Sequence, residues 1–164
     1  MLFRSRNGAQ AAGALPLEPF LGPCRVIHAI GCGPLVLPAH LAHAADTLPG
    51  RVLVRTARRA ALDAWHDDFA AFAPQTIEWL ADRGVVLVGI DTPSIDPAES
   101  KTLDSHQAVL RRGLRVLENL LLDAVEPGDY ELIALPLAWV EADASPVRAV
   151  LRELPARTGH GDEP

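Results

Sequence analysis

Short apolar runs separated by proline, glycine and polar stretches predict a chain that alternates between strands and helices. Four of these runs are rich in branched apolar residues and have the length of buried strands. They cover residues 24–30, 51–56, 85–91 and 130–135. A further run, residues 145–151, fits a strand or a helix by its pattern alone. Turn-forming residues before the first run predict a loop there, namely Pro16, Pro19, Gly22 and Pro23.

Two segments carry the signals of helices. Residues 38–46 place proline in the first turn. Residues 74–83 also open on proline, Ile77 and Leu80 fall on one face, and a glycine follows as a C-terminal stop. Loop residues are expected between the strand at 51–56 and Phe72. Because a strongly apolar strand directly follows the second helix, the order of elements predicts an α/β fold with helices covering a sheet.

The segment 102–123 holds one histidine, His106, twelve residues before Glu118. In one straight helix these side chains would lie about 18 Å apart along the axis. Two ligands of one metal ion each lie about 2 Å from it, so a continuous helix excludes a shared metal site. From spacing alone, a surface histidine and a solvated glutamate are the simpler interpretation.

Gly113 provides another possibility, because glycine ends helices readily and interrupts them at a cost. A helix over residues 105–112, a reversal at Gly113 and a following strand would return Glu118 to the side of His106. Ser105 or Asp104 would cap such a helix. The sequence therefore leaves open both a surface pair and a buried pair.

Composition limits the class of protein. The 164 residues fit one domain over residues 1–154, with an atypical start at 1–7 and a disordered polar tail at 155–164. The net charge of −6 and the scattered arginines argue against a nucleic-acid partner. No apolar run approaches the ~18 residues of a membrane span, so we expect a cytoplasmic protein with no membrane partner. Cys24 and Cys32 form no CxxC pair, and both are expected to pack as small apolar residues.

A long ordered signature resembles the metal-dependent cyclase family and, within it, the bacterial kynurenine formamidases, also called arylformamidases. It is GIDTPSIDPAESKTLDSHQAVLRRGLRVLENLLLDAVEPGDYELIALPL, residues 89–137, and LEPFLGPCRVIHAIG, RVLVRT and DASPVRAVLR extend it in the same order. The resemblance spans roughly residues 8–152. It implies an α/β swivelling β/β/α (cyclase-like) fold, a homodimer and two divalent metal ions per subunit, usually zinc. It also implies hydrolysis of N-formyl-L-kynurenine to L-kynurenine and formate in tryptophan degradation.

The resemblance assigns His106 and Glu118 as ligands of the second metal ion, because the family's ligands have the same separation, and it favours a strand at residues 145–151. The family motif H-x-G-T-H-x-D-x-P, which supplies the first metal's ligands, a bridging carboxylate and an acid–base histidine, is absent. We therefore expect an N-terminally truncated domain with no identifiable catalytic residue, a weak zinc site, little activity and exposed apolar surface. None of the five other histidines matches the motif. They are His28, His40, His43, His66 and His160.

Two alternatives remain beside the formamidase interpretation. One is a non-catalytic scaffold or dimerisation protein that has lost the metal centre. The other is a related cyclase-family amidohydrolase such as an isatin hydrolase. The long DTPSIDPAESK match favours a formamidase over the second alternative.

Overall fold

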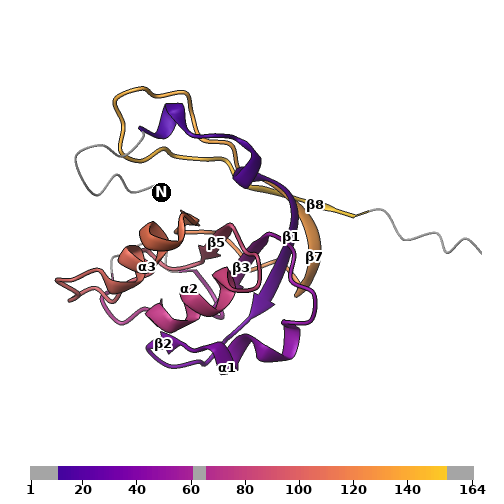
Figure 1. The fold of residues 1–164 in the computed structure, drawn as a ribbon. Helices are drawn as coiled ribbons and strands as arrows, with labels where there is room; N and C mark the ends of the chain where they lie inside the picture. Colours follow the sequence, from indigo (N-terminus) through magenta and orange to yellow (C-terminus); the bar gives the residue numbers. More distant parts are fainter. Residues whose placement is uncertain (1–10, 61–65, 155–164) are drawn as a thin grey trace, which may run out of the picture.

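A six-stranded mixed sheet forms the centre of the molecule in the computed structural model, which describes residues 11–60 and 66–154 (Figure 1). The strand order is β6-β5-β3-β1-β7-β8. The first four strands in this order run parallel, and β7 and β8 are antiparallel to their neighbours. The strands are β1 (Leu21–His28), β3 (Arg51–Arg55), β5 (Leu87–Ile90), β6 (Arg115–Leu117), β7 (Gly128–Ile133) and β8 (Val150–Glu153). Two short strands, β2 (Leu35–Val36) and β4 (Ala71–Phe72), pair separately.

The helices pack against one face of this sheet (Figure 1). They are α1 (Pro38–Leu41), α2 (Pro74–Ala81) and α3 (Asp104–Arg112). The described residues also form three short 3-10 turns: η1 (Ala12–Ala14), η2 (Glu18–Phe20) and η3 (Ala42–Ala44). Arg112 of α3 donates hydrogen bonds to Glu78 and Asp82, which ties α3 to α2. The expected α/β class is confirmed.

Successive side chains of the central strands point to opposite faces of the sheet, and they form two apolar cores, one on each face. On β3, Val52 and Val54 enter the helix-side core and Leu53 enters the other. All three are buried, as expected for a parallel strand covered on both faces. On β5, Gly89 lies beneath Leu53 and Leu120, and a Cβ at this position would collide with both side chains. The close approach of these leucines therefore depends on a glycine.

The first strand begins earlier than predicted, because β1 includes Gly22 and Pro23, which the sequence assigned to a loop. β7 pairs with β1 from Leu21 onward, whereas β3 pairs with it only from Cys24. Pro23 therefore lies where β1 has a neighbour on one side only, a position that tolerates the missing amide proton. The prediction of a loop was wrong because β7 lies about a hundred residues further along the chain.

Several other boundaries also differ from those predicted. The helix expected over residues 38–46 is divided between α1 and η3, and the loop before Phe72 contains β4. α2 opens on Pro74 as predicted and ends two residues early. In the segment 145–151, only Val150 and Leu151 belong to β8, so the strand expected there is mostly irregular chain. The predicted tail at residues 155–164 and the atypical start at 1–7 lie outside the described residues.

An arm of two segments extends from the sheet (Figure 1). Residues 11–20 run beside residues 134–149, where Ala12 N–H donates to Ala142 O at 2.9 Å and Gly13 N–H donates to Trp139 O at 3.1 Å. Five large apolar side chains of this arm are exposed, namely Leu17, Leu135, Leu137, Trp139 and Val140. None of the helices that the structure describes is long and apolar enough to cross a membrane.

Candidate active site

The chain reverses at Gly113, which brings two distant segments together. α3 ends at Arg112, and Gly113 has a φ of 68°, in the left-handed region that favours glycine. Leu114 N–H donates to Val109 O at 3.0 Å and closes the turn. β6 then pairs in parallel with β5 and ends immediately before Glu118. The predicted helix, glycine reversal and strand are confirmed.

This reversal places His106 and Glu118 against each other. The His106 Nε2 atom lies 3.4 Å from the Glu118 Oε1 atom. The two residues are only 6% and 9% exposed, respectively. The interpretation of a surface histidine and a solvated glutamate is therefore wrong. Glu118 follows the carboxyl end of a parallel strand, the edge of α/β sheets at which ligands commonly bind.

The cap of α3 comes from Asp96, a residue outside the helix. Its Oδ1 atom accepts a hydrogen bond from Ser105 N–H at 2.8 Å, and its Oδ2 atom accepts one from His106 N–H at 3.0 Å. Asp104 is exposed, and the Ser105 hydroxyl donates to Phe72 O at 2.7 Å. The prediction that Asp104 or Ser105 caps the helix was wrong, because the preceding loop folds back over the helix start.

The same carboxylate fixes the orientation of the His106 ring. His106 Nδ1 lies 2.6 Å from Asp96 Oδ2, and both residues are buried. Burial raises the pKa of Asp96, but the hydrogen bonds from His106 and from two backbone amides outweigh it and lower the pKa below its usual range. An ionised carboxylate only accepts hydrogen bonds, so the proton lies on Nδ1. With its proton on Nδ1, the ring turns Nε2 toward Glu118.

Glu118 is also held from the backbone. Its Oε1 atom accepts a hydrogen bond from Ile95 N–H at 2.9 Å. Burial raises the pKa of this carboxyl, against the opposing effect of the Ile95 amide. Two atoms with lone pairs therefore face each other in a buried position. A positive charge between them, either a proton or a metal ion, stabilises that arrangement.

The pair fits two ligands of one metal ion. Donor atoms that each lie about 2.0–2.2 Å from a tetrahedral zinc ion are roughly 3.3–3.6 Å apart. The 3.4 Å between His106 Nε2 and Glu118 Oε1 falls within that range. Asp96 matches the carboxylate that typically orients a metal-binding histidine through its other nitrogen. Within residues 11–60 and 66–154, no group of three His, Cys, Asp or Glu side chains is placed to hold a metal ion.

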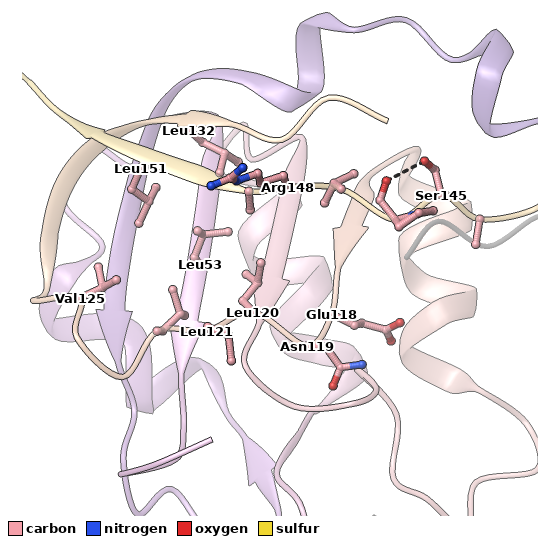
Figure 2. Close-up of a pocket in the computed structure, with 15 residues that line it drawn as sticks. Leu53, Glu118, Asn119, Leu120, Leu121, Val125, Leu132, Ser145, Arg148 and Leu151 are labelled. Carbon is pink, nitrogen blue, oxygen red and sulfur yellow. Dashed lines mark hydrogen bonds between the residues drawn. The ribbon is translucent and has the colours of Figure 1, made fainter. Parts of the chain in front are cut away.

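Two cavities open beside this pair. Glu118 lines the first, of about 810 Å³, which lies between the loop after β6 and the segment leading to β8 (Figure 2). The second, of about 780 Å³, lies over the carboxyl ends of the parallel strands and is lined by Thr56 and Asp91. Asp91 accepts hydrogen bonds from the Thr56 hydroxyl at 2.7 Å and from the Thr56 and Ala57 amides. Both cavities share Asn119, Leu120 and Leu121.

The other histidines of the described chain are not gathered at this pair. His28 ends β1, and its Nε2 atom lies 2.8 Å from Val125 O. His40 accepts a hydrogen bond from the Leu37 amide at 3.0 Å through Nδ1, while His43 is exposed. His66 lines the second cavity. The remaining histidine, His160, lies outside the described residues.

The two cysteines differ in burial. Cys24 is fully buried in the core of the sheet, as predicted, and burial raises its pKa to about 12. Cys32 is only half-buried and lines the second cavity, and burial raises its pKa as well. Both are free thiols.

Comparisons of this sequence with known proteins agree on one family. A family model described as "Putative cyclase" matches residues 3–97, which precede His106 and Glu118. The kynurenine formamidase of Bordetella avium is 79% identical over 148 residues, which cover 90% of this chain and 71% of that protein. The kynurenine formamidase of Delftia acidovorans is 69% identical over 142 residues, which cover 87% of this chain and 68% of that protein.

Comparisons of structure agree with the sequence. A protein described as a potential metal-dependent hydrolase with cyclase activity superposes with a TM-score of 0.79 at 29% identity, covering 89% of this chain and 72% of that one. An isatin hydrolase bound to the product analogue thioisatinate gives a TM-score of 0.67 at 21% identity, covering 85% of this chain and 62% of that one. At that identity the second likeness shows the fold alone.

Proposed function

This chain belongs to the cyclase family, and from that membership we propose that it hydrolyses N-formyl-L-kynurenine to L-kynurenine and formate with the help of a divalent metal ion. The observation that carries the proposal is the 79% identity to the Bordetella avium kynurenine formamidase across 90% of this chain. The buried contact between His106 and Glu118 supports it, since these are the two residues expected to be metal ligands.

In this reaction water adds to the formyl carbon and the bond between that carbon and the aryl nitrogen breaks. The nitrogen leaves as the aryl amine with one proton from water, and the formyl group leaves as formate. The chemistry that a bound divalent ion supplies is Lewis acidity, which polarises the carbonyl and lowers the pKa of water. Asp96 holds the proton on His106 Nδ1 so that Nε2 presents a lone pair. The Ile95 amide keeps the Glu118 carboxylate beside it.

Zinc is the ion that we propose for this pair. A nitrogen donor and a carboxylate oxygen suit zinc, and the distance between them matches tetrahedral coordination. Two protein ligands are fewer than the three that a catalytic zinc ion typically has. We therefore expect weak binding by this chain, and activity that rises when zinc is added.

The function is tested by measuring turnover of N-formyl-L-kynurenine by the full chain with added zinc. Release of the aryl amine is followed by near-ultraviolet absorbance, and formate is measured independently. We expect Glu118→Gln to lower the rate at least about tenfold, since it removes a charged ligand. Glu99→Gln, a matched change at an exposed glutamate, is expected to keep the wild-type rate. Absence of turnover by a folded wild-type chain that binds zinc contradicts the proposal and favours the non-catalytic scaffold.

We also propose that two copies of the chain associate. The exposed apolar side chains of the arm support this, because Val140 is 74% exposed and Trp139 is 56% exposed. Large apolar side chains gathered in this way commonly mark protein interfaces. Light scattering on the purified chain is expected to give the mass of a dimer, and a monomer at all concentrations contradicts this proposal.

A further inference from the structure

The cavity beside Glu118 has an apolar floor that no part of the proposed chemistry has yet used. Its volume is about 810 Å³, which is ample for an aryl amino acid. Leucines from four parts of the fold line it: Leu53 from β3, Leu120 from the loop after β6, Leu132 from β7 and Leu151 from β8. In the view of Figure 2, these leucines form a row with Glu118 at one end. Such a surface suits the face of an aromatic ring.

Among the described residues that line this cavity, two are charged, Glu118 and Arg148. Arg148 lies on the irregular segment before β8, and Figure 2 shows its side chain over the part of the leucine row furthest from Glu118. Among the described arginines, eight form hydrogen bonds or ion pairs with carboxylates or with backbone oxygens, as Arg25 does with Asp129 at 2.6 Å. Among the residues that the structure describes, none forms a hydrogen bond or ion pair with the Arg148 guanidinium. Its donors are therefore available to a ligand.

We propose that Arg148 binds the α-carboxylate of an aryl amino acid whose ring lies on the leucine row and whose amide end reaches Glu118. The inference rests on the proposed function and adds the group that recognises the substrate's acid end. A guanidinium binds a carboxylate through two parallel hydrogen bonds, which fixes orientation as well as charge. The metal-binding pair and the carboxylate-binding group then hold the two ends of one molecule across an apolar floor.

The test is a calorimetric titration of the full chain with L-kynurenine and with 2-aminoacetophenone, which has the same aryl ketone but no amino acid group. We expect wild-type protein to bind L-kynurenine roughly tenfold more tightly or better, the effect of a hydrogen-bonded charged group. Arg148→Ala should remove this preference and leave binding of 2-aminoacetophenone unchanged, and Arg148→Lys should restore part of it. Arg152→Ala is the matched control, since this exposed neighbour pairs with Glu131 outside the cavity.

The inference is overturned if wild-type protein shows no preference for L-kynurenine, or if Arg148→Ala keeps it. Turnover of N-formyl-L-kynurenine by the same samples separates this inference from the proposed function. Hydrolysis with an unchanged KM in Arg148→Ala would remove only the role of Arg148. A carboxylate preference that depends on Arg148 in a chain without turnover would remove only the proposed reaction.

Discussion

Replacing Asp96 by asparagine should weaken metal binding without changing either proposed metal ligand. The Asp96 carboxylate accepts three hydrogen bonds: from the Ser105 amide at 2.8 Å, from the His106 amide at 3.0 Å, and from His106 Nδ1 at 2.6 Å. Asparagine has one oxygen and one NH₂ group, so it cannot accept all three. When its oxygen faces the Ser105 amide, its NH₂ group faces the backbone nitrogen and the Nδ1 atom of His106.

The imidazole ring can adapt by moving its proton from Nδ1 to Nε2, whereupon Nδ1 accepts a hydrogen bond from the new amide. The Nε2 atom that faces Glu118 then loses its lone pair. Loss of such an orienting partner typically weakens metal binding 10- to 100-fold, so we expect a change of roughly that size for Asp96→Asn. The His106 amide also loses its acceptor, and a buried unpaired donor costs about 1–3 kcal/mol of folding stability.

Zinc titrations and ¹⁵N-detected histidine spectra measure the two consequences separately. Ser105→Ala is the control, because it removes the buried hydrogen bond to Phe72 O and should cost about the same stability. We expect this control to leave the His106 tautomer and the zinc affinity unchanged. If Asp96→Asn keeps the proton on Nδ1 and binds zinc as wild-type protein does, Asp96 has no positioning role.

Three further predictions concern the glycines and the thiols. Gly89→Ala should lower the free energy of unfolding by about 1–3 kcal/mol through overpacking in the core, whereas Gly50→Ala, where a Cβ has ordinary contacts, should change little in chemical denaturation. Gly113→Ala should cost about 1–2 kcal/mol because of its positive φ, and Gly113→Asn should cost less, since asparagine tolerates that conformation; equal costs would contradict a left-handed turn. In thiol labelling at pH 8, Cys32 should react before Cys24, because only about one in ten thousand Cys24 thiols is ionised at a pKa of about 12; faster labelling of Cys24 would contradict its burial.

Local sequence signals allowed the reversal that forms the site, since Gly113 could end a helix and the apolar run after it could form a strand. Spacing alone favoured a surface pair, and the family resemblance favoured the shared position of His106 and Glu118 that the structure has. The role of Asp96 was not predictable in this way. It lies eight residues before the helix and acts only because the intervening loop folds back, whereas Asp104 and Ser105 had the usual cap positions.

Pairing between distant strands limited the prediction elsewhere. Pro23 was placed in a loop because proline rarely occurs within strands, yet β7 supplies a neighbour on the side that proline permits. Residues 145–149 have the composition of a strand but pair with none of the strands that the structure describes. They line the cavity beside Glu118 instead, and Arg148 is one of them. The unpaired state of that arginine depends on every charged group around it, which no local pattern records.

The sharing of one metal ion by His106 and Glu118 is tested most directly by titrating the full chain with cobalt(II), a visible-light reporter for zinc sites. We predict a cobalt absorption band in wild-type protein that His106→Ala abolishes and that Glu118→Gln weakens by at least about tenfold in affinity. Glu99→Gln should keep the wild-type band and affinity, because that side chain is exposed. A band of unchanged intensity and affinity in both His106→Ala and Glu118→Gln would show that the ion binds elsewhere.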